Sequence, residues 1–165
     1  MSNLEPINFS SIIADFSADV ELTPALAESR RNRICELEAA IRNTPNNIPP
    51  EVANDGNLEH FFAGGVYGRK LFIPAGQAVV SKIHRAKTLN ILLEGAASVI
   101  SERGYHLYQA PHVFVSDPFT KRVVITHEDT VWLTAHGTYQ TELDKVEDEI
   151  IAKDFTELNQ LKESL

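Results

Sequence analysis

The sequence predicts a mainly β fold, a small sandwich or barrel, with helices at both ends. Three observations lead to this prediction. Short β-type runs fill the region from about His60 to Thr138, at a spacing of roughly 8–12 residues that is typical of antiparallel sandwiches and barrels. Turn residues separate the runs, for example Pro74-Ala75-Gly76 and Asp117-Pro118. The flanking segments, residues 24–43 and 141–165, have apolar residues at helical spacing.

Apolar and polar residues alternate in several of the β-type runs, as in antiparallel strands with one buried face. Val113 and Val115 show this pattern, and so do Val123 and Ile125. The predicted strands, in chain order, are Val66–Ile73, Ala78–His84, Leu89–Leu93, Ala97–Ser101, His106–Gln109, Val113–Val115, Arg122–Thr126 and Val131–His136.

The helix predicted over residues 24–43 has recognisable ends. Thr23 suits the N-cap, Pro24 suits the first helical position, and Asn43-Thr44-Pro45 ends the pattern. Cys35 lies among the apolar positions, so we expect it to be a small core residue. Three cations follow one another closely in this helix, and we expect them to lie on a solvated face; they are Arg30, Arg31 and Arg33.

Both ends of the chain lie outside the β-rich region. Residues 1–22 hold five large apolar side chains with irregular spacing, and they predict a loosely structured arm, either a frayed terminus or an arm exchanged between subunits. Residues 141–165 predict two short helical segments, with Thr141 capping the first and Asp154 and Glu157 forming a capping box for the second. The five apolar residues of the arm are Ile7, Phe9, Ile12, Ile13 and Phe16.

A chain of 165 residues fits one domain, which we divide into four parts. Residues 1–22 form the arm, and residues 23–59 form the helix and a Pro/Asn-rich connector. Residues 60–140 form the barrel, and residues 141–165 form the helical tail.

Charge and composition limit the classes of function. The net charge of −8 argues against a nucleic-acid-binding face, which needs clustered Lys and Arg. No run of about 18 apolar residues exists, so we expect no membrane span, and the N-terminus lacks the features of a signal peptide. The single cysteine, Cys35, cannot form an internal disulfide, which suits a reducing compartment. We therefore expect a cytoplasmic protein, in a host cytoplasm or a virion if a phage encodes it.

The β-rich region resembles the cupins, whose first motif is a Gly, a His-x-His, a Glu and a closing Gly. Here Ile73-Pro74-Ala75-Gly76 opens that motif, His84 follows, and Leu92-Leu93-Glu94-Gly95 closes it. The second cupin motif is a Pro-rich turn followed by a His, and the run from Val115 to Arg122 stands in its place. The resemblance covers about half of the chain and implies a cupin-like jelly-roll β-barrel.

More narrowly, the sequence resembles small single-domain cupins of bacteriophage and prophage genomes. The runs that carry this likeness are IPAG, KIHRAKTLNILLEG, APHVFVSDPFTKRV and EDTVWLTAHGT, with a leading helix and an acidic helical tail. The resemblance implies a phage-encoded homo-oligomer, with other phage or virion proteins as further partners and neither nucleic acid nor membrane among them.

The residues that hold a cupin metal are mostly missing. The family holds its metal with three His and one Glu, and only His84 stands at such a position here. Ala86 has no donor atom, Thr88 is a poor ligand, and Arg122 is a cation that repels a metal. A catalytic metal needs about three protein ligands with one position open. We therefore predict no metal ligands and no catalytic residues.

His136 lies on a predicted strand that, in a cupin, borders the cavity. His84, Asn90, Arg122 and His136 are therefore the predicted ligand-binding residues, in a pocket without metal that can bind a small anion. A divalent metal at His84 and His136 stays an open alternative, and it needs a carboxylate that we cannot place.

These observations support three hypotheses of function. The first is a non-catalytic oligomeric cupin, a structural or binding component that is phage-encoded and associated with the virion. The second is a metal-dependent cupin enzyme, of the dioxygenase or isomerase type, acting on a small molecule. The third is a phage protein that binds and modulates a host protein; it fits the acidic composition but has no signature in particular residues.

Overall fold

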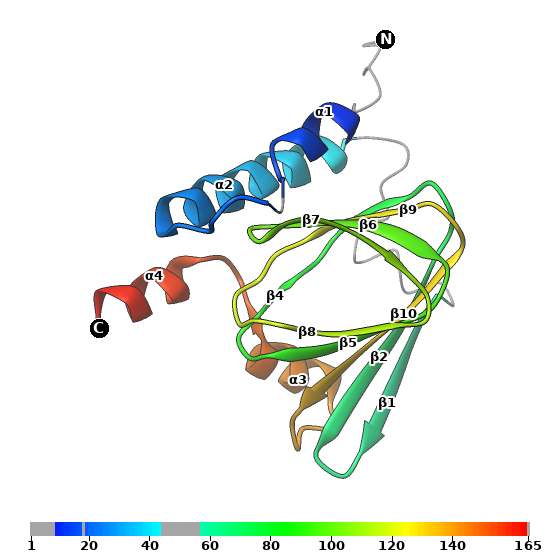
Figure 1. The fold of residues 1–165 in the computed structure, drawn as a ribbon. Helices are drawn as coiled ribbons and strands as arrows, with labels where there is room; N and C mark the ends of the chain where they lie inside the picture. Colours follow the sequence, from blue (N-terminus) through cyan, green and yellow to red (C-terminus); the bar gives the residue numbers. More distant parts are fainter. Residues whose placement is uncertain (1–8, 18, 44–56, 165) are drawn as a thin grey trace.

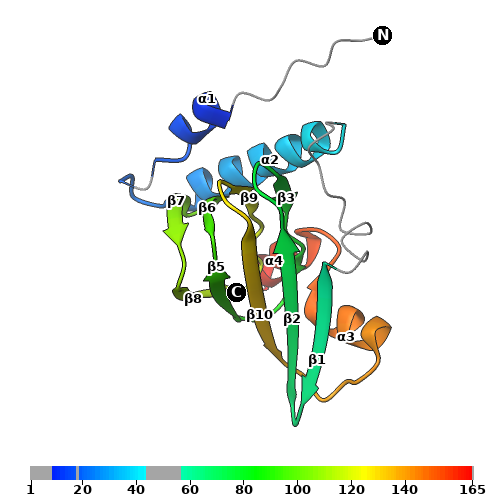
Figure 2. The same cartoon turned by 90° about the vertical axis from the view of Figure 1, so that its right-hand side faces the viewer.

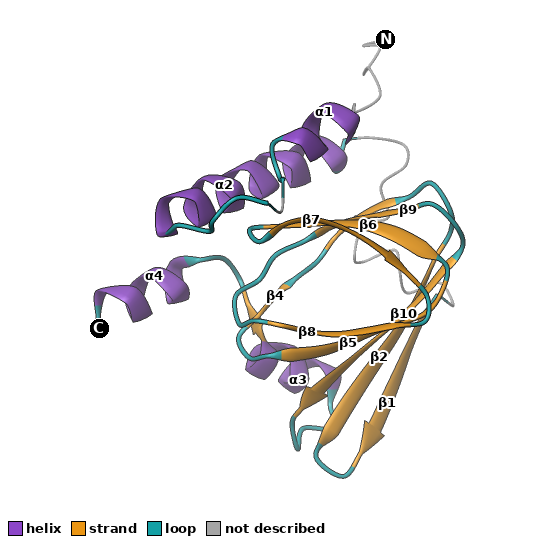
Figure 3. Cartoon of the chain, viewed as in Figure 1, coloured by secondary structure: helices purple, strands orange, loops and turns teal. Residues whose placement is uncertain are grey.

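The computed structural model describes residues 9–17, 19–43 and 57–164. Two antiparallel sheets face each other, and helices lie toward both ends of the chain (Figures 1 and 3). The predicted mainly β fold with N- and C-terminal helices is therefore confirmed.

The larger sheet has five strands and the smaller one four. The five-stranded sheet has the order β1 (Leu58–Ala63), β2 (Val66–Ile73), β10 (Thr130–Gly137), β5 (Thr88–Glu94) and β8 (His112–Ser116). The four-stranded sheet has the order β3 (Ala78–Val80), β9 (Val123–Thr126), β6 (Ala96–Ser101) and β7 (Gly104–Gln109). A further short pair joins β4 (Ile83–His84) to β11 (Ile151–Ala152).

This strand order is that of a jelly roll. Strands far apart in the sequence are neighbours: β2 pairs with β10, and β3 pairs with β9. The chain alternates between the two sheets, as two interlocked Greek keys require. The predicted jelly roll is confirmed, but the sheets of the described residues are two facing layers that do not close into one hydrogen-bonded barrel.

The strand predictions differ from the structure in two places. The predicted strand Ala78–His84 divides into β3 and β4, because β4 leaves the four-stranded sheet and pairs with β11 from the tail. Strand β1 was not predicted. Its burial does not alternate, since Phe61 and Phe62 are both exposed, and only pairing with β2 reveals it as a strand.

Two helices cover the outer face of the four-stranded sheet (Figure 1). They are α1 (Phe9–Ala14) and α2 (Pro24–Ile41), and Thr23 caps α2 as predicted, since its hydroxyl accepts from the Leu26 N–H at 3.2 Å. The helices and the sheet share one apolar cluster, which contains Ile12, Phe16, Ile34, Leu37, Ile41, Ala78, Ile100 and Val123.

The prediction of a loosely structured arm is wrong for residues 9–17. Phe16 is fully buried, and its carbonyl accepts a hydrogen bond from the Tyr105 N–H at 2.7 Å. Ile12 is buried in the same cluster. The irregular spacing hid this contact, because the chain turns after α1 and adds Phe16 from outside the helix. Ile7 lies outside the described residues.

The prediction of a solvated basic face on α2 is wrong for Arg30 and Arg31. Both side chains are buried. Arg30 donates to the carbonyls of Ser17 and Glu102 at 2.7 and 3.0 Å, and Arg31 forms an ion pair of 2.5 Å with the Glu102 carboxylate. The two arginines thus attach α2 to the β6–β7 turn, while Arg33 is exposed as predicted.

Cys35 is exposed, so its prediction as a core residue is also wrong. Its neighbour Ile34 is fully buried, and one residue turns a helix by about 100°, far enough to move Cys35 from the covered face.

The C-terminal tail contains α3 (Leu143–Ile150) and α4 (Thr156–Glu163). Thr141 does not cap α3; Glu142 occupies the N-cap without a side-chain hydrogen bond. Asp154 accepts from the Thr156 N–H at 2.8 Å, but Glu157 binds Arg85, so the predicted capping box does not form. None of the helices in the described part of the chain is long and apolar enough to span a membrane.

Candidate functional site

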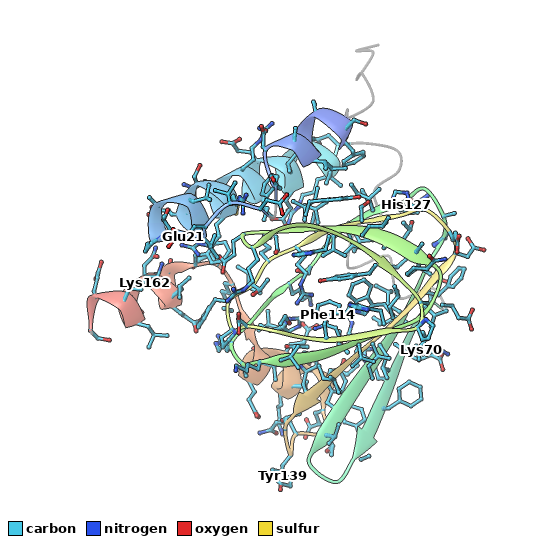
Figure 4. All side chains as sticks on the ribbon, viewed as in Figure 1. Glu21, Lys70, Phe114, His127, Tyr139 and Lys162 are labelled. Carbon is cyan, nitrogen blue, oxygen red and sulfur yellow. The ribbon has the colours of Figure 1, made fainter. Side chains whose placement is uncertain are left out.

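A cavity lies between the two sheets. It offers about 80 Å³ to the centres of water-sized groups, several times the space that one water needs. Strands β2, β3, β4, β5, β9 and β10 all contribute side chains to it. Figure 4 shows how densely side chains fill the space between the sheets, with Phe114 near its middle. The cavity is thus the interior of the jelly roll, where inward-facing positions of both sheets meet.

Most of the wall of this cavity is apolar. The hydrophobic side chains come from both sheets and include Leu71, Ile73, Val79, Val124 and Trp132. Trp132 packs edge to face against Phe114, with ring centroids 5.8 Å apart. Such a wall excludes water and favours a ligand with an apolar body.

Arg122 is the most deeply buried cation of the cavity, at 5% exposure. Burial lowers its pKa to about 10, which still leaves the guanidinium charged at neutral pH. It lies over the Phe114 ring, 5.7 Å from the centroid, and donates to the Asn90 side-chain oxygen at 3.3 Å. No carboxylate of the described residues forms an ion pair with it. Arg122 is therefore a buried positive charge with most of its N–H groups available.

Asn90 uses all of its hydrogen-bonding groups to hold its neighbours. Its oxygen accepts from Arg122 and from the Trp132 indole N–H, both at 3.3 Å. Its amide nitrogen donates to the Thr88 carbonyl at 2.9 Å and to the Ser116 hydroxyl at 3.1 Å. Fully buried and fully bonded, Asn90 fixes the position of Arg122 and has nothing left for a ligand.

Two further cations line the cavity, Arg69 on β2 and Lys82 between β3 and β4. Burial lowers the pKa of Arg69 from its usual value, and Tyr67 and the Glu147 carboxylate only partly oppose that shift. Arg69 forms no ion pair with a described carboxylate. Lys82 is paired with Glu147 of α3 at 2.5 Å. No Asp or Glu is among the residues that line the cavity. The cavity therefore carries net positive charge in a protein whose overall charge is −8.

His84 and His136 form a ring pair at one side of the cavity. Their centroids are 4.6 Å apart, and both side chains are buried. Burial, followed by the charges of His136 and Arg122, lowers the pKa of His84 to about 3, and burial and Arg69 lower the pKa of His136 to about 4. Both imidazoles are neutral at physiological pH. His84 lines the cavity, whereas His136 lies behind it and contacts the Thr134 hydroxyl at 3.2 Å.

The C-terminal tail sets the position of His84. Strand β11 pairs with β4, with Ile151 opposite His84. The next residue, Arg85, binds both carboxylate oxygens of Glu157 at 2.7 and 2.8 Å and the carbonyl of Asp148 at 2.6 Å. The tail is thus a structural part of the site.

The residues of the cavity do not fit the metal of the cupin family. His84 and His136 are adjacent, but Arg69, Lys82 and Arg122 surround the cavity with positive charge, which opposes a divalent cation. Across the described ranges 9–17, 19–43 and 57–164, no group of three or more His, Cys, Asp or Glu can hold a metal ion.

The structure changes one position of the predicted motif. Ala86 is not among the residues that line the cavity, whereas Lys82 is. Lys82 and His84 are two residues apart and both border the cavity, so Lys82 stands where the other His of a His-x-His pair would be.

Of the four predicted ligand-binding residues, His84, Asn90 and Arg122 line the cavity together, and His136 packs behind His84. Sequence reasoning missed Arg69 and Lys82. Arg69 alternates with Leu71 and Ile73 along the predicted strand, so all three side chains lie on the same face of it. A charged residue on the apolar face of a predicted strand could therefore have indicated Arg69 as a site residue.

A second cavity, with about 90 Å³ of space, lies on the other side of Arg122. Tyr108, Phe114 and His106 line it, and His106 and Tyr108 stack with centroids 5.7 Å apart. Arg122 borders both cavities, and the second one, unlike the first, includes an acidic residue, Asp117, in its lining.

No protein-family model matches the sequence, and no curated protein matches it. Several solved structures resemble part of the chain. KdgF from a Halomonas species has a TM-score of 0.45 and 12% identity, covering 52% of this chain and 81% of that one. The cupin domain of Cnp3 from Schizosaccharomyces pombe has a TM-score of 0.43 and 16% identity, covering 56% and 70%.

A cupin-2 domain protein from Shewanella frigidimarina has a TM-score of 0.42 and 10% identity, covering 50% of this chain and 80% of that one. The Schizosaccharomyces pombe and Shewanella frigidimarina structures are described as cupin domains. With TM-scores below 0.5 the likeness carries no argument about the site, and the jelly-roll assignment rests on the strand order itself.

Proposed function

We propose that this chain is a non-catalytic jelly-roll protein whose interior cavity binds a small organic anion, a carboxylate or a phosphate ester with an apolar body. The observation that supports this most strongly is the charge of the cavity. Arg69 and Arg122 border it without an ion pair to any carboxylate of the described residues, and no lining residue is acidic.

A buried, unpaired guanidinium is costly because burial removes its hydration. An anion in the cavity offsets that cost by supplying charge-assisted hydrogen bonds. The planar fork of Arg122 suits the two oxygens of a carboxylate or phosphate, and Asn90 already holds the fork in place. In this proposal Arg122 is the main anion-binding residue and Asn90 is a positioning residue.

The remaining lining residues suit the rest of such a ligand. The wall that includes Leu71, Val124 and Trp132 accepts an apolar chain or ring. Neutral His84 offers one ring nitrogen as a hydrogen-bonding group at the cavity surface. No group in this arrangement is paired as a nucleophile with a general base, and so the proposal assigns binding and no reaction.

Calorimetric titration with butyrate and phenyl phosphate, against the uncharged butyramide, tests the proposal. We expect at least one anion to bind and the amide to bind at least tenfold more weakly. Arg122→Gln should weaken anion binding at least tenfold, whereas Arg42→Gln, the same change at the exposed residue that follows α2, should leave it unaltered. Equal binding of amide and anion, no binding of either anion, or full binding by Arg122→Gln would contradict an anion site.

Metal analysis separates this proposal from a metal-dependent enzyme. The protein is purified without added metal and then supplemented with iron, zinc, manganese or nickel before bound metal is measured. Under the proposal no metal is retained near stoichiometry. Near-stoichiometric metal that is lost in His84→Ala would overturn the non-catalytic proposal.

A phage origin, a virion location and a host-protein partner stay predictions from sequence. If the coding gene lies in a phage genome, mass spectrometry of purified particles tests the virion prediction directly. Detection of this chain at a fixed copy number per particle supports a structural role, and its absence from the particles argues against one.

A further inference from the structure

The second cavity lies where the edges of the two sheets come together. Strand β7 is an edge of the four-stranded sheet and β8 an edge of the five-stranded one, and no ladder between described residues joins the two strands. In Figure 2 these strands lie one above the other on the same side of the molecule. The cavity offers about 90 Å³ to the centres of water-sized groups, several times the roughly 10–15 Å³ that one water needs. This space suits a ligand built on one six-membered ring.

This cavity has a deep end and an open end. Arg122 marks the deep end, since it is only 5% exposed. Arg103 and Asp117 also line the cavity, and they form an ion pair whose side chains are 58% and 40% exposed. The lining therefore leads from a solvated ion pair to a buried cation.

One wall of the second cavity is aromatic. Tyr108 is central to it, with its ring centroid 5.7 Å from that of His106 and 4.8 Å from that of Phe114. The rings of His106 and Tyr108 are nearly parallel, with an interplanar angle of 3°. Aromatic rings prefer offset-stacked or edge-to-face contacts at centroid distances of about 4.5–7 Å, so a planar ring can extend this array. None of these three side chains lines the first cavity.

Polar groups of the same cavity have hydrogen-bonding capacity to spare. Asp117 binds Arg103 through Oδ2, and its Oδ1 has no hydrogen bond among the described residues. Arg122 donates to Asn90 and keeps further N–H groups. Burial raises the pKa of the Tyr108 hydroxyl, which therefore stays protonated and can donate. The cavity thus offers a ligand both donors and an acceptor.

The charges of the second cavity favour a neutral ligand. Its lining includes both signs of charge, whereas no acidic residue lines the first cavity. An anion would meet the carboxylate of Asp117, and a cation would meet Arg103 and Arg122. A neutral molecule avoids both repulsions, and it can present an acceptor to Arg122 and a donor to Asp117. Hydrogen bonds to such charged groups are stronger than those between neutral groups.

We infer that the second cavity is a separate binding site for a neutral planar aromatic molecule with a hydrogen-bond acceptor at one end of its ring and a donor at the other, such as a phenol that carries an amide. The ring stacks on the wall of His106, Tyr108 and Phe114. Arg122 binds the acceptor, and Asp117 binds the donor at the open end. The inference goes beyond the proposed anion binding and does not depend on it.

Calorimetric titration of the native chain at pH 7 provides the first test. The probe is 4-hydroxybenzamide, and its saturated analogue 4-hydroxycyclohexanecarboxamide has the same polar groups without an aromatic ring. We expect the aromatic probe to bind saturably and at least about threefold more tightly than the saturated analogue, because only the aromatic probe can stack. The cation 4-hydroxybenzylamine should bind more weakly than 4-hydroxybenzamide, because Arg122 repels it.

Two variants locate the binding in this cavity. Tyr108→Leu should weaken binding of 4-hydroxybenzamide by about threefold or more, whereas Tyr139→Leu, at a tyrosine that is 91% exposed and lines neither of the two cavities, should leave it unaltered. Asp117→Asn should also weaken binding, because it removes a charged acceptor, and Asp144→Asn at an exposed position of α3 is its control.

Circular dichroism checks that the variants fold. Asp117 is partly exposed and its ion pair contributes little to stability, so Asp117→Asn decides the question if Tyr108→Leu does not fold. Three outcomes would overturn the inference: no saturable binding of 4-hydroxybenzamide at millimolar concentrations, equal binding of the saturated or cationic analogue, or full binding by the folded variants. Butyrate titration of the same native protein keeps the two proposals apart. Loss of butyrate binding alone contradicts the anion site, and loss of 4-hydroxybenzamide binding alone contradicts the second site.

Discussion

The two sheets of this protein are built from similar strands but have opposite surroundings. The four-stranded sheet lies under α1 and α2, and its outer residues, such as Ile100 and Val123, are fully buried. The five-stranded sheet has aliphatic outer residues as well, yet Val113 and Val115 are more than half exposed. On β5 and β8 the inward positions include the polar Asn90 and Ser116, whereas the outward positions are aliphatic.

Because of this difference, the two sheets contribute to the protein in different ways. The covered sheet stabilises the fold, because its outer face and the helices form a closed apolar core. The other sheet supplies Asn90, Trp132 and Arg69 to the cavity, and the aliphatic residues on its outer face stay exposed. Changes on the two sides should therefore have very different effects. Four tests, taken from the largest expected effect to the smallest, examine this comparison.

Phe16→Ala should have the largest effect, a loss of about 3–5 kcal/mol in the free energy of unfolding, because Phe16 is fully buried where α1 meets the covered sheet. Urea unfolding followed by circular dichroism measures the loss. Ile13→Ala, a partly buried neighbour in the same segment, is the control and should cost less. A loss below about 1 kcal/mol would mean that α1 contributes little to the covered face.

Acid should destabilise the inner face of the five-stranded sheet. The pKa of His84 is lowered to about 3 and that of His136 to about 4, against 6.5 for an unfolded histidine. Between pH 6.5 and about 4 the unfolded chain therefore binds more protons than the folded one, so stability is complete above pH 6.5 and is lost as the pH falls. The slope is up to about 1.4 kcal/mol per pH unit for each histidine.

Urea unfolding at pH 7, 6 and 5 measures this slope. His84→Gln should make the decline between pH 7 and pH 5 smaller, because it removes the more strongly shifted group. The same decline in the variant and the native chain would argue that the His84–His136 pair is not buried as described.

Arg122→Leu should raise the stability of the ligand-free protein by about 1 kcal/mol, because it replaces a buried, unpaired cation by an apolar side chain. Anion binding should be lost in the same variant. Unfolding curves with and without phenyl phosphate measure both effects, since the anion should stabilise only the native chain. A variant destabilised by more than about 2 kcal/mol would assign Arg122 a structural role instead.

Val113→Thr should have the smallest effect. Its side chain is mostly exposed, so the free energy of unfolding should change by less than about 0.5 kcal/mol. Urea unfolding followed by circular dichroism measures the change. A loss above about 1 kcal/mol would mean that the outer face of the five-stranded sheet is covered in solution.

Much of the β-rich region could be predicted from the sequence. Strand β2 has the bounds predicted for it, Val66–Ile73, because alternation and the turn at Pro74 are local signals. The motif positions also indicated His84 and Arg122, and Asn90 was predicted to share their pocket; the structure brings all three to one cavity. These residues lie at set distances from the turns of the motif, and the turns of a jelly roll determine which strands are neighbours.

Other features depend on contacts between distant segments. Strand β4 is separate from β3 only because β11, about 70 residues later, pairs with it. Arg30 and Arg31 are buried because carbonyls and a carboxylate near the β6–β7 turn accept their hydrogen bonds. A basic run in a helix has the same pattern whether or not such acceptors face it, so the sequence could not distinguish the two cases.

The sequence by itself determined that residues at alternate positions would face opposite sides of each strand, and that Arg122 would stand where a metal ligand is expected. Alternation is a property of the extended backbone, and neither conclusion needs a partner segment. Only the tertiary structure decided which apolar face the helices cover, that Arg69 joins Arg122, and that Asn90 holds Arg122 in place. These outcomes depend on packing between segments far apart in the chain, and the spacing of residues within one segment does not predict that packing.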